Sequence, residues 1–183
     1  MAWIALIAGL ALWTGAHLWK RLAPASRERF GDAGKGIVAG LSLLAIVLMV
    51  LGYRGAEGPV WWGRSTALTG INNLLMVVAF LLFGAGSVGS WLSKRMRHPM
   101  LTGVKIWAAA HLLVNGDLAS FILFGGLLAW AVAQVILINR SESWAPDPDA
   151  RPGQRDLILV VVWLIIFAAV AWVHTWLGYS PFG

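Results

Sequence analysis

Imidazoles are the groups of this sequence best suited to chemistry, because a histidine ring can ligate a metal, transfer a proton or bond a carbonyl. The chain has four of them: His17, His98, His111 and His174. An ionisable or strongly polar side chain inside an apolar membrane segment is costly, and is therefore a functional candidate. The same criterion adds four further side chains: Asn72, Asn73, Lys105 and Asp117.

His111 and His17 need the most explanation, because both lie within apolar runs. Trp107 and Asn115 stand four residues before and after His111, so the three side chains share one helix face. Without a ligand, His111 would be a core histidine bonded to a carbonyl. Without a ligand, His17 would be an interfacial histidine that reaches toward lipid headgroups. From the residues alone, each histidine could have this structural role or could ligate a metal.

The remaining polar side chains have simpler structural roles. His98 precedes Pro99 and marks the start of a helix, and His174 is expected near a membrane surface. Lys105 either extends its amine toward the inner surface along its apolar stem or faces an acidic ligand group such as a propionate. Asp117 is expected to cap the helix that follows it.

The residue types present exclude several chemistries. There is no cysteine, so the chain has no thiolate metal site, disulfide or cysteine nucleophile. Paired carboxylates, a glycine-rich phosphate loop and a His-x-x-x-His spacing are also missing. Neutral imidazoles from different helices of a bundle can, however, hold haem iron. Tryptophan and leucine side chains would bury the macrocycle, and basic residues near the inner surface would meet its propionates. The pattern permits haem b without specifying it.

The chain around these residues is too apolar for a soluble protein. Of its 183 residues, 59% are hydrophobic and 12% are charged, whereas soluble domains carry about 25% charged residues. The net charge of +6 lies mainly in short connections between apolar runs, which favours retention at an anionic membrane surface over binding to nucleic acid. We expect a single membrane domain over residues 1–183.

Six apolar runs predict helices that cross a bilayer, which takes about 20 residues. They are Ala2–Trp19, Gly36–Tyr53, Ser65–Ser93, Pro99–Val114, Leu118–Asn139 and roughly the first 20 residues of Leu157–Gly183. The fourth run is short and is followed by a turn signature at residues 115–117, so the fourth and fifth runs could instead form a re-entrant hairpin. Asn72 and Asn73, in the third run, are expected to hydrogen-bond across helices.

The positions of lysine and arginine predict the orientation. Eleven basic residues lie in the odd-numbered connections, whereas the even-numbered connections hold two, Arg54 and Arg64. Because basic connections stay on the inner side of a membrane, both termini are expected on the outer side. The predicted fold is therefore an all-α, polytopic transmembrane bundle of about six helices.

An internal segment and both ends of the chain resemble a known family. The segment contains Arg97–Gly103 (RHPMLTG) and Trp107–Asp117 (WAAAHLLVNGD), and the ends contain Gly15-Ala16-His17 and His174–Gly178. Together they resemble the signature of the NnrU family of bacterial membrane proteins, which is associated with nitrogen-oxide respiration in denitrifying bacteria. The resemblance implies a multi-pass protein of the bacterial inner membrane. The family is in turn similar to zeta-carotene isomerase, a haem-b membrane enzyme that performs a redox-dependent cis–trans isomerisation.

The resemblance implies that His17 and His111 are the axial ligands of haem b, and that His98 has a role in function. The predicted cofactor site comprises six residues: His17, His98, Lys105, Trp107, His111 and Asn115. Two nitrogens on one iron lie about 4 Å apart, at about 2 Å per bond. His17 should sit about 5 Å inside the inner surface, and His111 about 18 Å inside it, or about 9 Å if Lys105 marks the boundary. Depth alone would pair His17 with His98 and His111 with His174, whereas the resemblance favours His17 with His111.

Three functional hypotheses follow. The first is a haem-b membrane protein that acts as a redox-active accessory or sensor factor in nitrogen-oxide metabolism. The second is a haem-dependent cis–trans isomerase of zeta-carotene or another polyene, in which case the protein is an enzyme. The third is a cofactor-free membrane assembly protein. The expected partners are the lipid bilayer and, for the isomerase, a hydrophobic polyene; nucleic acid is not expected.

Overall fold

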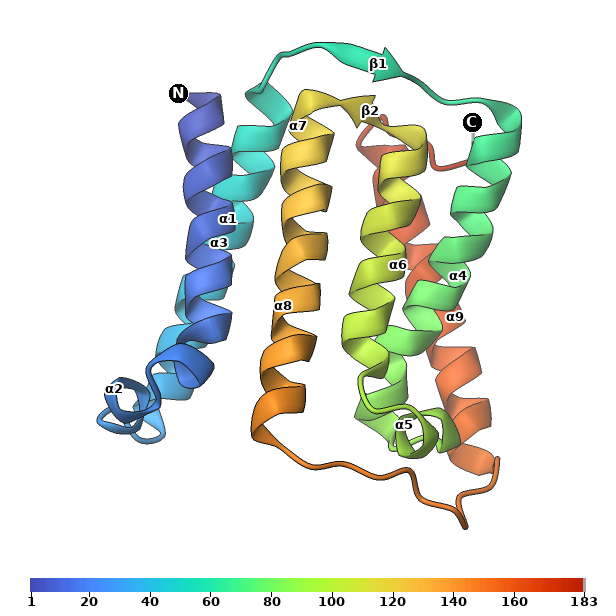
Figure 1. Ribbon diagram of the computed structural model, residues 1–183. Coiled ribbons are helices and arrows are strands. Elements are labelled where there is room, and N and C mark those ends of the chain that lie inside the picture. Colours follow the sequence, from blue (N-terminus) through green and yellow to red (C-terminus); the bar gives the residue numbers. More distant parts are fainter. Residues whose placement is uncertain (183) are drawn as a thin grey trace.

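Six apolar segments form helices that run side by side in this computed structural model, which describes residues 1–182 (Figure 1). A helix pairs its own backbone groups, as a segment in lipid must. The long helices are α1 (Ala2–Leu22), α3 (Ala33–Gly55), α4 (Thr66–Val88), α6 (Pro99–Val114), α8 (Gly126–Ser141) and α9 (Gln154–Trp176). Five of the segments are long and apolar enough to cross a membrane, and α6 is shorter. The predicted all-α bundle is confirmed.

The two ends of the bundle differ in charge. Both termini lie at one end, which we call the terminal end (Figure 1). The opposite end, which we call the basic end, carries the connections with eleven lysines and arginines. Both termini therefore lie at the end opposite to these basic connections, which agrees with the arrangement that the sequence predicts. The chain is therefore a multi-pass membrane protein whose helices contact the lipid bilayer.

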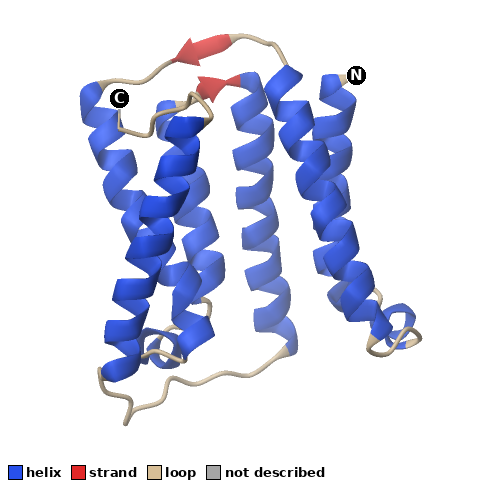
Figure 2. Ribbon diagram, turned by 180° about the vertical axis from the view of Figure 1, so that it is seen from behind, coloured by secondary structure: helices blue, strands red, loops and turns tan. Residues whose placement is uncertain are grey.

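The turn after α6 reaches the terminal end. Strand β1 (Val60–Trp62), from the α3–α4 connection, pairs antiparallel with β2 (Gly116–Asp117). Both strands lie at the same end as the termini (Figures 1 and 2). α6 and α8 therefore form a hairpin that extends through the bundle, and the re-entrant alternative is wrong.

Helix α8 stands between two groups of helices (Figures 1 and 2). α1 packs along α3, while α4 packs along α6 and also contacts α9. α8 contacts α1 on one side and α6 on the other. The hydrophobic core accordingly combines side chains from α1, α3, α6 and α8 with Ala119 of α7; among its larger members are Leu6, Leu18, Met49, Leu101, Leu127 and Trp130.

The segment before α8 begins with a helix cap and contains a π-helical turn. The Asp117 carboxylate accepts from the Ser120 N–H over 2.9 Å at the start of α7 (Leu118–Ser120), which is the cap predicted from the sequence. The π-helical turn η1 (Phe121–Gly125) follows. The Ser120 hydroxyl donates to Asp117 Oδ2 over 2.6 Å, so the Tyr53 hydroxyl, 2.8 Å away, donates to it. These bonds tie α3 to α7 at the terminal end.

The third predicted run ends earlier than expected. It was expected to reach Ser93, but α4 ends at Val88 because Gly89 adopts a left-handed backbone (φ +61°) and closes the helix. A separate short helix, α5 (Trp91–Arg95), follows on the basic end. A second short helix that the apolar pattern did not predict is α2 (Pro24–Glu28).

The last helix begins before the predicted Leu157. The Asp156 carboxylate accepts from the Gly153 N–H over 2.9 Å, so the helix is already formed at Gln154. Gly183, the end of the last apolar run, lies outside the described residues.

The two asparagines of α4 do not bond across helices, so that expectation is wrong. Nδ2 of Asn72 donates to Oδ1 of Asn73 on the same helix over 3.1 Å. Oδ1 of Asn72 is buried and has no hydrogen-bond partner among residues 1–182. This pair therefore does not link α4 to a neighbour by a hydrogen bond.

Glycines allow α1 and α3 to approach closely. A Cβ added to Gly52 would lie 2.3 Å from the backbone nitrogen of Leu6, and one added to Gly9 would lie 2.8 Å from that of Met49. Backbone atoms cannot rotate away as side chains do, so a larger residue at either position would separate the helices.

Gly52→Ala is expected to destabilise the protein by about 1–3 kcal/mol, the usual cost of overpacking. Gly40→Ala is the matched control on the same helix, because no atom lies within 4 Å of its added methyl group. Thermal unfolding of the detergent-purified variants measures the difference. Equal midpoints for the two variants would contradict the described packing of α1 on α3.

Candidate functional site

His17 lies in an aromatic cluster between α1 and α8. Its ring stacks on that of Trp13, with 4.0 Å between the ring centroids, and meets the edge of Trp130 at 5.1 Å. Trp13 and Trp130 contact each other at 5.4 Å. Trp130 is only 6% exposed, so the cluster extends into the interior of the bundle. His17 thus packs between two indoles, and the structure does not support the alternative in which it reaches toward headgroups.

The helix backbone determines which nitrogen of His17 is available. Nδ1 lies 2.9 Å from the carbonyl oxygen of Trp13. A carbonyl oxygen only accepts, so Nδ1 carries the proton and donates it. In the neutral ring, Nε2 then holds the lone pair, which is the state in which a histidine binds a metal.

Three buried polar atoms without partners belong to the same region. They are Nε1 of Trp13, Nε1 of Trp130 and Oε1 of Gln134, which follows Trp130 by one turn of α8. An unsatisfied buried polar group costs about 1–3 kcal/mol, so two donors and one acceptor are a substantial penalty. We call Trp13, His17, Trp130 and Gln134 the His17 cluster. Its composition fits a largely apolar ligand that also carries polar groups.

Two members of the His17 cluster, both on α8, were not predicted from the sequence. Gln134 is a polar residue within the predicted fifth run, so the criterion that selected Asn72 and Asn73 applies to it as well. Trp130 stands four residues earlier and shares its helix face. No sequence signal indicated that this face would meet α1.

His111 lies in a second aromatic group, nearer the terminal end of α6. Its ring centroid lies 4.9 Å from that of Trp107 and 4.6 Å from that of Phe124 in η1. Its Nδ1 donates to the Trp107 carbonyl over 2.9 Å, so its Nε2 is also free to accept. Nδ2 of Asn115 donates to the His111 carbonyl over 2.8 Å. His111 is thus bonded to a carbonyl, as expected for a core histidine without a ligand. Its Nε2 could still bind a metal.

The two histidines contact the same helical segment at different levels. His17 meets Trp130, and His111 meets Phe124, six residues earlier. Six residues correspond to about 9 Å along a helix, whereas two nitrogens on one iron lie about 4 Å apart. The described arrangement does not bring the two imidazoles together, and their joint ligation of haem stays a prediction.

His98 is engaged at the basic end. Its Nε2 lies 2.8 Å from Oδ1 of Asn139 near the end of α8. Close by, Arg21 at the end of α1 pairs with Glu142 over 2.6 Å, and the Arg97 guanidinium donates to the Glu142 carbonyl. These bonds connect α1, α6 and α8 below the His17 cluster. They give His98 a positioning role between helices and leave its Nε2 less available to a metal than that of His17.

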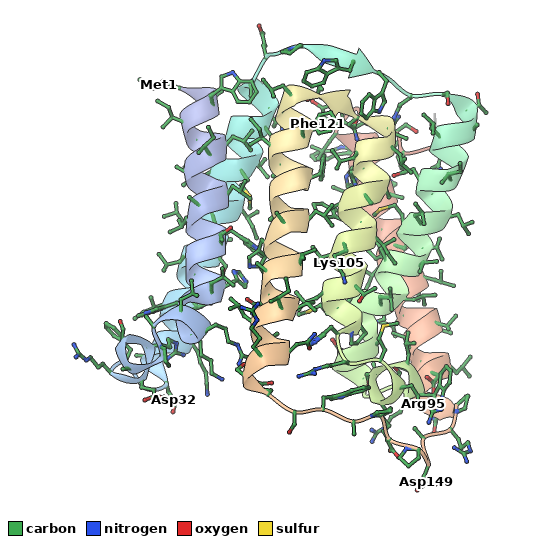
Figure 3. All side chains as sticks on the ribbon, in the orientation of Figure 1. Met1, Asp32, Arg95, Lys105, Phe121 and Asp149 are labelled. Carbon is green, nitrogen blue, oxygen red and sulfur yellow. The ribbon has the colours of Figure 1, made fainter. Side chains whose placement is uncertain are left out.

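Among residues 1–182, Lys105 is the only lysine or arginine in the middle of a long helix, because those of α1, α3, α8 and α9 lie within three residues of a helix end. Its side chain is half-buried on α6, and Figure 3 labels it between α6 and α8. Across residues 1–182, no hydrogen bond or ion pair involves its amine. The neighbouring Val104 packs against the core that contains Trp130. A half-buried amine in this place is suited to an anionic group of a ligand.

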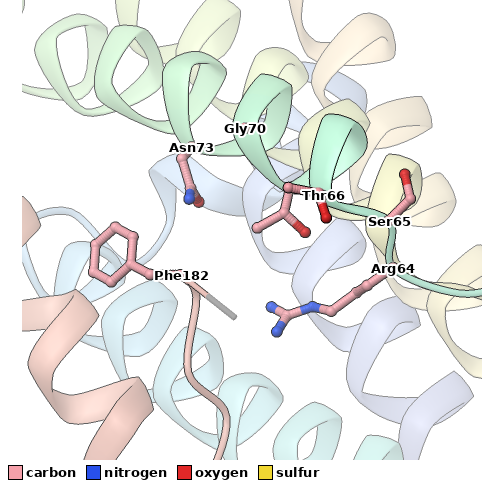
Figure 4. A pocket seen from close by; sticks show the side chains of 7 residues that line it. Arg64, Ser65, Thr66, Gly70, Asn73 and Phe182 are labelled. Carbon is pink, nitrogen blue, oxygen red and sulfur yellow. The ribbon is translucent and has the colours of Figure 1, made fainter.

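A pocket of about 540 Å³ opens at the terminal end and contains none of the six predicted site residues (Figure 4). It is lined by Arg64, Ser65, Thr66, Thr69, Gly70, Asn73 and Phe182. His174, at the same end of α9, is exposed and donates to the Val170 carbonyl over 2.8 Å. Within the described part of the chain, no three histidine or acidic side chains cluster as ligands of a metal ion.

A match to a protein-family model shows which family the chain belongs to. The family model described as NnrU protein matches residues 5–181, which is almost the whole length. The chain belongs to the NnrU family. No curated protein and no solved structure matches it. In this NnrU protein, α8 lies between α1, which carries His17, and α6, which carries His111. Both histidines lie within the matched range.

The Arg21–Glu142 pair should make the stability of this NnrU protein depend on pH. The hydrogen bond and the positive charge of Arg21 lower the pKa of Glu142 below its ordinary value. A lowered acid pKa stabilises the folded state above the ordinary pKa, and this contribution is lost as the pH falls through the folded value. Native protein should therefore melt slightly above Glu142→Gln at pH 7, and the gap should close in acid. Thermal unfolding of both at several pH values tests this; a gap independent of pH would contradict it.

Proposed function

We propose that this NnrU protein binds haem b within its bundle and acts as a redox-active accessory or sensor factor in nitrogen-oxide metabolism at the bacterial inner membrane. The observation that carries the proposal is the His17 cluster: the His17 ring contacts Trp13 and Trp130, whose buried indole nitrogens have no partner among residues 1–182, and the unpaired Oε1 of Gln134 lies one turn farther along α8. Haem iron binds neutral imidazole, and propionate oxygens accept hydrogen bonds from N–H donors. The donor set of the cluster therefore fits the group.

Residues of three helices would hold the cofactor. His17 on α1 is the ligand with the stronger case, because its neighbours include the unpaired donors of Trp13 and Trp130. His111 on α6 is the second ligand that the family resemblance implies, and its Nε2 is likewise free. Lys105 is half-buried and suited to a propionate, since its amine pairs with no group in the described part of the chain.

The roles of protein and cofactor are separate. Haem, when bound, supplies one-electron redox chemistry. The chain fixes the tautomer of its imidazoles through the Trp13 and Trp107 carbonyls and shields them with aromatic rings. The link to nitrogen oxides comes from the association of the family with nitrogen-oxide respiration. Turnover of tri-cis zeta-carotene under reducing conditions distinguishes the isomerase alternative, and absence of product excludes it for that substrate.

Detergent-purified protein supplied with haem b is expected to show a Soret band. His17→Ala should abolish the band, and His111→Ala should abolish or shift it, because each removes a free Nε2. His174→Ala is the matched control, since this exposed histidine has the same carbonyl bond but lies outside the cluster. Optical titration with haem measures all four proteins.

A shift in His111→Ala would mean that His17 alone retains the haem, and loss would mean that both imidazoles are needed. Loss of the Soret band in His174→Ala would overturn the choice of His17 and His111 as ligands. A native protein without a Soret band after haem supplementation would overturn the proposal and favour the cofactor-free assembly protein.

A further inference from the structure

The connection between α1 and α3 forms a basic pocket on the surface of the bundle. The pocket has a volume of about 420 Å³ and is lined by Lys20, Pro24, Arg27, Glu28, Gly31 and Lys35. Residues 20–35 contain five basic and two acidic side chains, so the connection has a positive net charge. This pocket is separate from the His17 cluster, with which it shares no residue.

The guanidinium of Arg27 is held in place within this pocket. Its Nη1 donates to the Gly31 carbonyl over 2.9 Å, and the group lies over the Trp19 ring at 5.9 Å. It also rests directly on Gly34, where an added Cβ would lie 2.0 Å from Nη1. Gly34 therefore leaves the space that the guanidinium occupies, and the planar donor is oriented before any ligand arrives.

Two further cations flank the fixed guanidinium. Lys20 is exposed and takes part in no hydrogen bond or ion pair among the described residues. Lys35 pairs over 2.8 Å with Asp32, but both side chains are largely exposed, so the pair is weak. One oriented guanidinium with two adaptable amines is the arrangement expected for a phosphate group.

The location of the pocket indicates where such a phosphate would come from. The α2 connection extends sideways beyond the helices at the basic end, away from α8 and α6 (Figures 1 and 2). Around it, Leu22 and Phe30 are exposed apolar side chains, and Trp19 packs against Phe30 at 5.4 Å. Exposed apolar and aromatic side chains beside lysines and arginines are typical of the lipid headgroup region.

We propose that this pocket binds the phosphate of an anionic phospholipid headgroup, with Arg27 as the oriented donor and Lys20 and Lys35 as flanking cations. Acyl chains would then lie along the exposed apolar side chains at the inner ends of α1 and α3. The lipid would fix the α2 connection against the membrane surface. The site does not depend on haem, so the test of this proposal is independent of the test of the proposed function.

The test compares glycine variants that leave the charge unchanged. Native mass spectrometry of the full-length protein, titrated with phosphatidylglycerol or phosphatidylcholine, measures lipid binding. Gly34→Ala displaces the Arg27 guanidinium and should weaken phosphatidylglycerol binding about fivefold, the effect of one cation at the surface. Gly36→Ala, two residues away with no atom within 4 Å of the added methyl group, should bind like the native protein.

A second pair of variants keeps the proposal testable if Gly34→Ala fails to fold. Arg27→Gln and Arg29→Gln each remove one charge from the same connection, but Arg29 does not line the pocket. Arg27→Gln should weaken phosphatidylglycerol binding, and Arg29→Gln should have little effect. Equal losses in both would mean general attraction to the membrane and would overturn the site.

Inorganic phosphate distinguishes a lipid from a soluble source. Phosphatidylglycerol should remain bound when millimolar inorganic phosphate is added, because its acyl chains also contact the protein. Binding of inorganic phosphate with no preference for phosphatidylglycerol over phosphatidylcholine would overturn the headgroup assignment.

Discussion

The contacts of α8 with α1 on one side and α6 on the other determine the rest of this structure. In lipid, apolar helices gain little from burying apolar surface against each other, so polar links and close packing must hold them. At the basic end these links are the Arg21–Glu142 ion pair and the bonds of Arg97 and His98 to the end of α8. At the terminal end, Tyr53 reaches Ser120 just before η1. α8 is therefore fixed at both ends, and the histidines of its two neighbours are positioned against it.

This arrangement explains why the candidate site lies along α8. The stretch from Phe124 to Gln134 supplies an aromatic partner for each of the two intramembrane histidines and an unpaired amide oxygen. Such polar atoms oppose folding unless a ligand satisfies them, so their concentration around His17 is hard to explain by packing alone. The π-helical turn η1 adds to this, because such turns recur at functional sites and this one carries Phe124. The separation of His17 and His111 along α8 follows from the same geometry.

Much of the fold was predictable from the sequence, because membrane segments carry strong one-dimensional signals. Apolar runs located the six helices, their number placed both termini at the end opposite to most lysines and arginines, and Asp117 was identified as a cap. The end of α4 was not predicted, since Gly89 lies within an uncharged run and only its left-handed backbone ends the helix. Trp130 and Gln134 were missed for another reason: which face of an apolar helix meets which neighbour depends on tertiary packing. The role of Gly34 was missed for the same reason, because it depends on the Arg27 guanidinium that packs against this glycine.

If the His17 cluster is a haem site, the His17 ring must offer an unprotonated Nε2, and nitrogen NMR of the histidines measures this. The chain has four histidines, so a ¹⁵N-histidine-labelled sample gives few signals, which single His→Gln variants assign. In haem-free protein we expect a protonated Nδ1 and an unprotonated Nε2 for His17. On addition of haem, the His17 signal should broaden or shift strongly while that of His174 stays in place. A protonated Nε2 on His17 in the haem-free protein, or a His17 spectrum that haem leaves unchanged, would contradict the haem site.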